Sequence, residues 1–238
     1  MKIPSLSIII PVYNEERCLT KSLDKVLRFL KANVKDFEVI VVDDGSSDST
    51  PEILRRFKEK VRVLRNEPNR GKGFSVKKGF LASSRPWTLF MDADLSTPLD
   101  EINHLWPFHR TQDMIFASRS MPGSRIIERQ GGFRRTLGRV FPWLVRLLAL
   151  PGFYDTQCGF KMMSKKAIQK VCHKQRVDRF GFDVELLLIA KRQGLRMKEV
   201  PVTWKNSDRS SLNPFKDPFK MLLELLRIKW NDLRRLYG

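Results

Sequence analysis

The stretch FMDADLSTP, residues 90–98, determines how the rest of the chain is interpreted. The apolar run WTLFM, residues 87–91, is typical of a buried strand, and it stops at Asp92. Asp94 follows two positions later, so two carboxylates come at the end of one predicted strand. One or two carboxylates beside substrate phosphates are a common site for Mg²⁺, and Mn²⁺ prefers the same oxygen ligands. An isolated DxD triplet can also be a simple strand-end cap, and the surrounding sequence has to separate these interpretations.

Strand and helix patterns alternate on both sides of this stretch. The sequence predicts strands at 6–12, 37–44, 61–66, 87–94 and 113–119, and helices at 15–31, from 49 onward and at 71–84. Such alternation indicates βαβ units. The predicted fold class is therefore α/β, with a Rossmann-like, mixed but mostly parallel sheet flanked by helices.

Polar clusters follow three of these strands, at 13–15, 43–45 and 92–94. Ligands of such sheets bind beyond the carboxyl ends of the strands. We therefore expect the three clusters to meet at one edge of the sheet. The aspartates at 43, 44 and 48 have an alternative role as turn and cap residues before the next helix.

The pattern changes after about residue 120. Residues 121–139 are basic and contain several glycines, residues 140–153 are apolar and aromatic, and residues 160–193 have a helical pattern. A further strand is predicted at 200–204. Residues 214–237 form a basic amphipathic segment with an apolar stripe of Phe215, Phe219, Leu222, Leu226, Trp230, Leu233 and Tyr237.

The composition restricts the class of partner. The chain has 238 residues, and its 45 lysines and arginines exceed its 26 aspartates and glutamates by 19. This excess indicates an anionic partner: nucleic acid, an acidic membrane or a phosphorylated substrate. No helix-turn-helix, RRM or zinc-finger pattern is visible, so a basic nucleic-acid-binding protein is only a distant alternative.

The cysteines and the apolar runs restrict the compartment. Cys18, Cys158 and Cys172 form no CxxC pair, which favours a reducing compartment, and we expect Cys158 to be a small buried residue. No apolar stretch approaches 18 residues, so no membrane-spanning helix is predicted.

The ordered motifs resemble those of the family-2 glycosyltransferases, which are inverting, nucleotide-sugar-dependent enzymes with the GT-A fold. Four segments carry this resemblance, which extends over residues 5–205: PVYNE, VVDDGSSDST, NRGKG and FMDADLS. Three later segments are similar to the polyprenyl-phosphate branch, which includes dolichyl-phosphate mannose synthases and undecaprenyl-phosphate relatives: ASRS at 117–120, the arginines at 134–135 and DTQCGFK at 155–161. TQCGFK followed by WKNSDRSSL is most similar to the dolichyl-phosphate β-glucosyltransferases.

The resemblance implies roles for the residues of the donor side. It assigns Asp44 to a nucleoside contact and Asp92 and Asp94 to the sugar nucleotide and its Mg²⁺ or Mn²⁺, with Asp94 as the more direct ligand. Ser96 is a departure, because dolichyl-phosphate mannose synthases often carry a glutamine ligand there. The remaining residues of the implied nucleotide-sugar site are Pro11, Tyr13, Asn14, Glu15, Arg70, Gly71 and Lys72.

The implied acceptor is a lipid phosphate, which is already anionic and needs positioning rather than a general base. Arg119 and either Arg134 or Arg135 are the expected phosphate ligands. Asp183 and Glu185 would supply a base only if the acceptor were a hydroxyl; otherwise they orient the sugar or pair with arginines. The sugar or acceptor pocket is expected to include Ser118, Gln157, Lys161 and Asp183.

These expectations combine into one hypothesis. Residues 1–212 form the GT-A domain, with a nucleotide-sugar half at 1–120 and an acceptor half at 121–212, and residues 213–238 form the basic amphipathic helix. The enzyme transfers a hexose, glucose from UDP-glucose in the favoured version, to a polyprenyl (dolichyl or undecaprenyl) phosphate with inversion. It is cytoplasmic and peripheral on the cytosolic face of a membrane. The alternatives are a GDP-mannose donor or a hydroxyl acceptor. The helix at 213–238 either packs on the domain or lies in the membrane interface.

Overall fold

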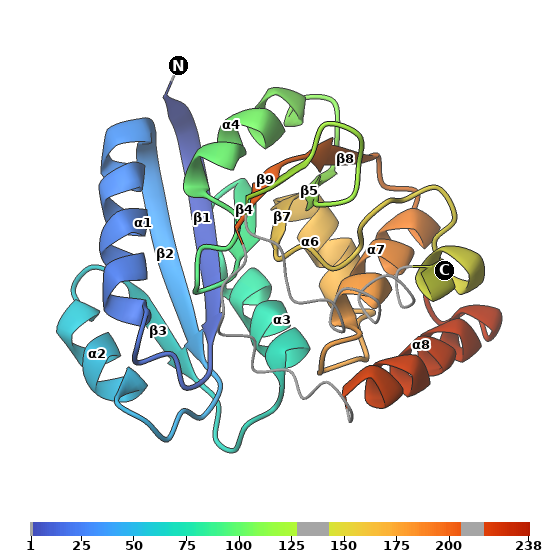
Figure 1. Ribbon diagram of the computed structural model, residues 1–238, viewed down its shortest axis with the longest axis horizontal. Helices are drawn as coiled ribbons and strands as arrows, with labels where there is room; N and C mark the ends of the chain where they lie inside the picture. Colours follow the sequence, from blue (N-terminus) through green and yellow to red (C-terminus); the bar gives the residue numbers. More distant parts are fainter. Residues whose placement is uncertain (1, 128–142, 206–216) are drawn as a thin grey trace.

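The protein was analysed as a computed structural model, which describes residues 2–127, 143–205 and 217–238. Its centre is a seven-stranded sheet in the order β3-β2-β1-β4-β7-β5-β8 (Figure 1). The strands are β1 Ile3–Val12, β2 Val34–Asp43, β3 Arg62–Arg65, β4 Trp87–Met91, β5 Met114–Ser118, β7 Phe160–Ser164 and β8 Met197–Pro201. A separate pair joins β6 Arg125–Ile126 and β9 Thr203–Trp204 in parallel.

Helices cover both faces of the sheet. Successive strand residues point to opposite faces, so each central strand contributes side chains to two buried clusters. Ile8 and Ile10 of β1 belong to one buried cluster, together with residues of α1 Leu19–Asn33, α2 Thr50–Phe57 and α4 Ile102–Leu105. Ile9 belongs to the other cluster, with α3 Lys72–Ala82, α6 Lys165–Cys172 and α7 Phe182–Arg192. Two short 3₁₀ helices, η1 Leu99–Glu101 and η2 Trp106–Phe108, flank α4. The result is a three-layer α/β/α arrangement.

The predicted helical pattern at 160–193 is wrong for its first five residues. Residues 160–164 form β7, which lies between β4 and β5 and runs antiparallel to both. Phe160, Met162 and Met163 are buried because helices cover both faces of this strand. The strand reads FKMMS, with Lys161 inside it and apolar residues on both faces, so it lacks the period of two that marks a half-exposed strand, and periodicity cannot separate it from a buried helix. The predicted strand at 200–204 is also divided, between β8 and β9.

The order of the strands confirms that the polar clusters meet at one edge. β1 pairs in parallel with β2 on one side and with β4 on the other. The strand order therefore reverses at β1. The crevice beyond the carboxyl ends of the strands at such a point is the usual ligand site of an open α/β sheet. Residues 13–15, 43–45 and 92–94 all follow strands that end there.

The C-terminal helix α8, Asp217–Leu233, has two apolar sides. Leu225 and Ile228 are buried in the second cluster, together with Tyr237 beyond the helix end. Leu226 and Trp230, two members of the predicted stripe, are at least 50% exposed. The helix thus packs on the domain and also presents an apolar surface, while the side chains of Phe215 and Phe219 lie outside the described residues. Within the described ranges, no helix has the length and apolar character needed to cross a bilayer.

Candidate active site

The loops after β1 and β2 are bound to each other. Asn14, which has a φ of 55°, donates its N–H to Ser46 Oγ at 3.0 Å and accepts from Ser47 N–H at 2.9 Å. Glu15 N–H donates to Thr50 Oγ1 at 2.9 Å. Burial raises the pKa of Glu15, and the neighbouring charges of Asp94 and Asp92 add to this effect. The loop after β1 therefore brings a third carboxyl group close to the DxD pair.

Asp44 anchors the loop that precedes α3. Its buried carboxylate accepts from Asn66 Nδ2 at 2.8 Å, Arg70 N–H at 3.0 Å and Gly71 N–H at 2.8 Å. Gly71 has a φ of 102°, and a Cβ there would lie 2.4 Å from the carbonyl oxygen of Asp178, so the loop requires glycine at this position. The structure thus assigns Asp44 a loop-holding role, and the expected nucleoside contact stays a prediction.

Asp92 and Asp94 have different partners. Asp92 Oδ1 lies 2.7 Å from Lys72 Nζ. Asp94 accepts from Ser96 N–H at 2.9 Å and from Ser96 Oγ at 2.7 Å, so Ser96 orients this carboxylate. The backbone of Gly159 lies against Asp92, because a Cβ at Gly159 would be 2.0 Å from Asp92 Oδ2.

These carboxylates would supply only part of the ligand shell of a hard divalent cation. In the part of the chain that is described, no group of three or more His, Cys, Asp or Glu side chains could hold a metal ion. Mg²⁺ commonly uses one or two protein carboxylates and completes its shell with water and substrate phosphates. Asp92 and Asp94 match that donor set.

Asp92 links the donor and acceptor sides of the site. Its charge acts on Glu15, Lys72, Arg119 and Asp183, four residues that are far apart in the sequence. Burial alone would lower the pKa of Lys72, but the charges of Asp92 and Asp183 raise it above its ordinary value. The fold thus brings together five of the residues that the sequence singled out.

Arg119 is held by Asp155, a residue that the sequence-based site omitted. Asp155 accepts from Arg119 Nε at 2.6 Å, from Nη2 at 3.0 Å and from the backbone N–H at 3.0 Å. Burial alone would raise the pKa of Asp155, but the guanidinium lowers it to about 2. Asp155 is the first residue of the motif DTQCGFK, and that position was the available signal. Arg134 and Arg135 lie outside the described residues.

Lys161 and Asp183 form a buried ion pair. Lys161 has no exposed surface, and its Nζ donates to the carbonyl of Cys158 at 2.7 Å and to the Asp183 carboxylate. Ser118 is also fully buried, and its Oγ accepts from Met121 N–H at 3.1 Å. The expected pocket-lining role therefore does not fit Lys161 and Ser118, whereas Gln157 is partly exposed.

Glu185 is not placed to act as a base. It has no exposed surface and accepts from Tyr237 Oη at 2.5 Å and from the N–H groups of Arg176 and Val177. Its role is to attach the C-terminal residues and the loop before α7, rather than the expected pairing with a sugar or an arginine. Cys158 is buried as expected, and burial raises its pKa to about 12, which leaves it a neutral thiol.

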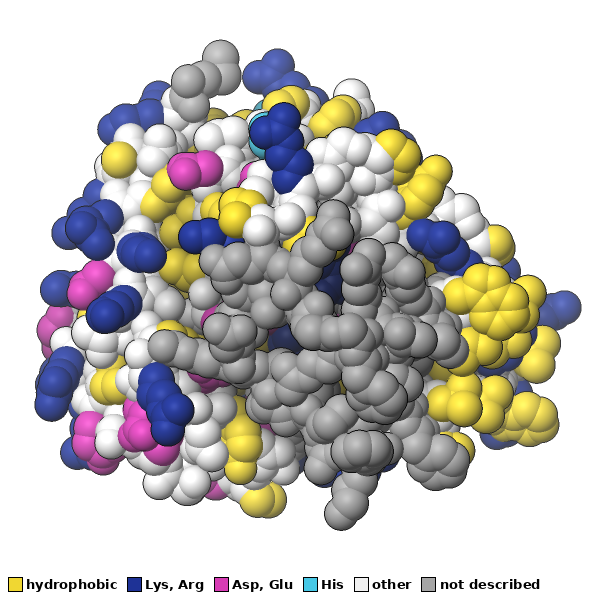
Figure 2. All heavy atoms as spheres, in the orientation of Figure 1, with side chains coloured by type: hydrophobic (Ala, Val, Ile, Leu, Met, Phe, Trp, Pro, Cys, Tyr) yellow, Lys and Arg dark blue, Asp and Glu magenta, His cyan; other side chains and the backbone are white. Residues whose placement is uncertain are grey.

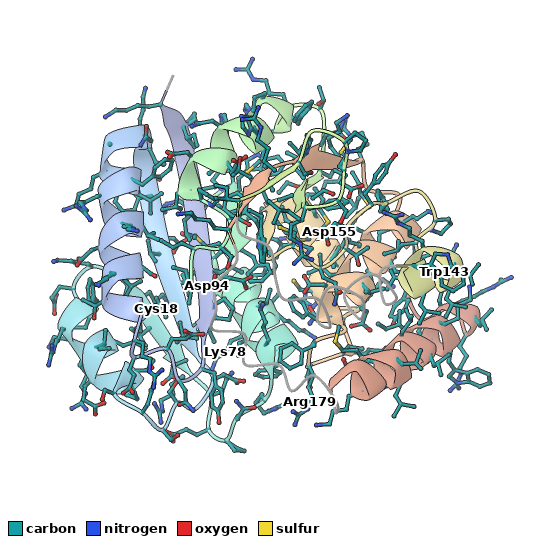
Figure 3. The ribbon with its side chains drawn as sticks, in the orientation of Figure 1. Cys18, Lys78, Asp94, Trp143, Asp155 and Arg179 are labelled. Carbon is teal, nitrogen blue, oxygen red and sulfur yellow. The ribbon has the colours of Figure 1, made fainter. Side chains whose placement is uncertain are left out.

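Three of the labelled side chains show where the candidate site and the periphery of the molecule lie. Asp94 and Asp155 both lie over the central part of the sheet, whereas Trp143 lies at the edge of the molecule near α8 (Figure 3). Trp143 belongs to a helical stretch at 143–148 that contributes Val145 to the same buried cluster as α8.

Comparisons with known proteins agree with this arrangement. The model of the family described as Glycosyl transferase family 2 matches residues 7–172. Dolichyl-phosphate beta-glucosyltransferase from Drosophila melanogaster is 38% identical, over 94% of this chain and 74% of that protein. The proteins of the same name from Homo sapiens and Dictyostelium discoideum are 34% and 33% identical, over 98% and 96% of this chain and 76% and 75% of theirs.

A solved structure supports the fold. Glucosyl-3-phosphoglycerate synthase from Mycobacterium tuberculosis, in complex with Mn²⁺, UDP-glucose and glycerol 3-phosphate, superposes with a TM-score of 0.71. The match covers 94% of this chain and 79% of that chain, at 18% sequence identity. The likeness concerns the fold alone, and together with the mixed, mostly parallel sheet it confirms the predicted GT-A architecture.

Proposed function

Because this chain belongs to glycosyl transferase family 2, we propose that it transfers glucose from UDP-glucose to dolichyl phosphate and forms a β-linked lipid phosphate sugar. The names of the relatives at 33–38% identity support glucose and the lipid acceptor. Support for UDP-glucose as the donor comes from the Mycobacterium tuberculosis synthase, which has the same fold and forms a complex with this sugar nucleotide.

One observation carries the choice of a phosphate acceptor over a hydroxyl acceptor. The two carboxylates that a hydroxyl acceptor would require, Asp183 and Glu185, are engaged by Lys161 and Tyr237. Arg119, in contrast, is fixed by Asp155 through Nε and Nη2. A guanidinium has five N–H donors, so three of them stay available for an anionic ligand. This arrangement suits an acceptor that needs charge compensation and no base.

The donor diphosphate would bind at the DxD pair. Mg²⁺ or Mn²⁺, held by Asp92 and Asp94, would supply Lewis-acid stabilisation of the leaving diphosphate. Lys72 lies beside Asp92 and contributes a positive charge at the same place. An oxygen of the acceptor phosphate attacks the anomeric carbon, the bond from this carbon to the diphosphate oxygen breaks, and its electron pair leaves with UDP. In-line attack converts an α-linked donor into a β-linked product.

A lipid acceptor requires access to a membrane, and we propose that one surface supplies it. Hydrophobic side chains gather at the edge formed by α8 and residues 143–148 (Figure 2). Six of them, each at least 50% exposed, define the apolar face: Trp143, Leu147, Leu223, Leu226, Trp230 and Leu233. Arg227, Arg234 and Arg235 are exposed on or next to the same helix, and the chain has a net charge of +19. Apolar side chains with basic neighbours suit an anionic bilayer surface.

Flotation with vesicles tests the occupant of the apolar face. We expect the protein to float with vesicles that contain anionic lipid, and we expect Trp230→Ala combined with Leu226→Ser to abolish this binding. Association of the protein with itself, seen by sedimentation and lost in the same variant, would instead assign the apolar face to a second copy.

We further propose the cytosolic leaflet as the location, because the three cysteines are free and buried, which suits a reducing compartment.

Transfer of label from UDP-glucose to dolichyl phosphate in detergent tests the reaction. We expect labelled lipid with Mg²⁺ or Mn²⁺, none with EDTA and none from Asp94→Ala. GDP-mannose in a parallel reaction tests the alternative donor. Labelled lipid from GDP-mannose alone would overturn the proposed sugar, and hydrolysis of the donor without lipid product would overturn the proposed acceptor.

A further inference from the structure

Residues 153–155 connect a short surface helix to the arginine that we expect to bind the acceptor phosphate. Arg146, within helical residues 143–148, donates from Nε to the carbonyl of Phe153 at 2.8 Å and from Nη2 to the carbonyl of Tyr154 at 2.7 Å. Its guanidinium also lies 5.2 Å from the centre of the Tyr154 ring. The next residue is Asp155, which holds Arg119. One side chain of the helix is thus attached to the segment that orients Arg119.

The sheet holds the same segment independently. The carboxylate of Glu199, in β8, accepts from Tyr154 N–H at 2.9 Å and from Asp155 N–H at 2.7 Å. The Phe153 ring also packs edge to face on Phe116 of β5, with 5.3 Å between the ring centres. Asp155 therefore stays attached to the sheet without Arg146. What Arg146 adds is a fixed link between the helix and the sheet-bound segment.

The helix that carries Arg146 also carries two residues of the apolar face. Trp143 and Leu147 are 60% and 64% exposed, whereas Val145 is buried against the domain. A bilayer would set the height of these exposed side chains, and it would also set the height of a lipid phosphate at its surface. The distance from the helix to Arg119 therefore has to match the distance from the bilayer interior to the phosphate.

We propose that Arg146 is a positioning residue that fixes the helix at 143–148 relative to Arg119 and so sets the depth at which the acceptor phosphate is bound. The inference rests on the proposed function. A guanidinium that donates two hydrogen bonds to two consecutive carbonyls is held in one orientation, which a lysine ammonium cannot reproduce. Depth matters only for an acceptor embedded in a bilayer. A short, water-soluble prenyl phosphate reaches Arg119 whatever the position of the helix.

The test compares two acceptors and three variants. Dolichyl phosphate in anionic vesicles is one acceptor, and a short-chain prenyl phosphate in buffer is the other. We expect Arg146→Ala and Arg146→Lys each to lower kcat/KM by roughly 10- to 100-fold for the vesicle acceptor, since a displacement of about 1 Å can cost about 100-fold, and less than threefold for the soluble one. Glu199→Gln, which loosens Asp155 itself, should lower both values to the same extent.

The outcomes are distinguishable. Equal losses on both acceptors in Arg146→Lys would make the residue merely structural and overturn the inference, as would wild-type activity on vesicles. Full rescue by lysine would show that charge alone matters and would also overturn it. Melting curves establish that each variant is folded. Failure of the wild type on both acceptors would instead contradict the proposed function, before any variant is compared.

Discussion

Two lysine–aspartate pairs lie next to the ring of Phe90, and they differ mainly in exposure. The Nζ atoms of Lys72 and Lys161 are 5.6 and 6.0 Å from the ring centre. The side chains of Lys72 and Asp92 are 31% and 32% exposed, so this open pair can exchange partners with a ligand. Those of Lys161 and Asp183 are 0% and 7% exposed, so this sealed pair is closed to solvent. We therefore propose that the same chemical pair serves binding in one place and structure in the other.

Asp92→Asn should have the largest effect, on activity alone. The amide keeps the shape of the side chain but removes a charge from the open pair and from the proposed metal site. We expect kcat/KM to fall roughly 1,000-fold, the upper end for removal of one group that stabilises developing charge. The free energy of unfolding should change little, because both side chains of the pair already contact solvent. A large loss of stability in urea unfolding would contradict the distinction between the two pairs.

Asp183→Asn should do the opposite and mainly affect stability. The substitution leaves the Lys161 charge buried without its counterion, and breaking a buried pair in this way costs about 3–5 kcal/mol. Chemical denaturation measures the loss, and Lys161→Met in the same background should recover part of it. If Asp183→Asn is as stable as the wild type but inactive, the sealed pair belongs to the reaction.

A third pair, Arg119–Asp155, has one partly exposed and one buried member, with 30% and 3% exposure. The folded-state pKa of Asp155, about 2, lies below its ordinary value of 3.8. Its ionisation therefore stabilises the fold above about pH 4, and this contribution disappears as the pH falls towards 2. The pH-dependent part of the stability difference between wild type and Asp155→Asn should be about 2 kcal/mol at pH 5–7 and shrink below pH 4. A difference that is constant from pH 7 to 3 would mean that the ion pair contributes nothing.

Lys72→Met should have the smallest effect. Removing one charged hydrogen-bond donor beside the diphosphate site should cost about 1.5 kcal/mol, or roughly tenfold in kcat/KM for the donor. Steady-state rates at varied UDP-glucose measure it, with Lys21→Met, at an exposed lysine of α1, as the control. An unchanged rate would show that Lys72 only neutralises Asp92 in the absence of ligand.

The meeting of the proposed donor-side residues at one edge of the sheet could be predicted from the sequence because these residues directly follow strands. Residues 13–15, 44 and 92–94 each end an apolar run, and parallel strands bring such positions together. The acceptor side could be predicted only in part. The contact between Arg119 and Asp155 spans 36 residues and depends on β7 entering the sheet between β4 and β5. That insertion was hidden because β7 has buried apolar residues on both faces, with Lys161 among them, and so does not show the period of two of a half-exposed strand.

The pairing of buried charges was not predictable either. Charged residues such as Lys161 and Glu185 usually lie at the surface, and only the packed structure reveals partners for both in the interior. The division into halves at residue 120 stays a prediction. The two halves share one sheet, since β7 of the second lies between two strands of the first.

The close contact between Gly159 and Asp92 has a consequence for mutational tolerance. Any side chain at position 159 would begin with an atom 2.0 Å from Asp92 Oδ2, closer than two non-bonded atoms can approach. Even the smallest substitution there, from glycine to alanine, would have to displace the Asp92 carboxylate or strand β7, which follows directly. In a saturation library at position 159, every substitution should therefore abolish activity, irrespective of the size or polarity of the new residue. The donor site depends on one absent methyl group as much as on the charges that surround it.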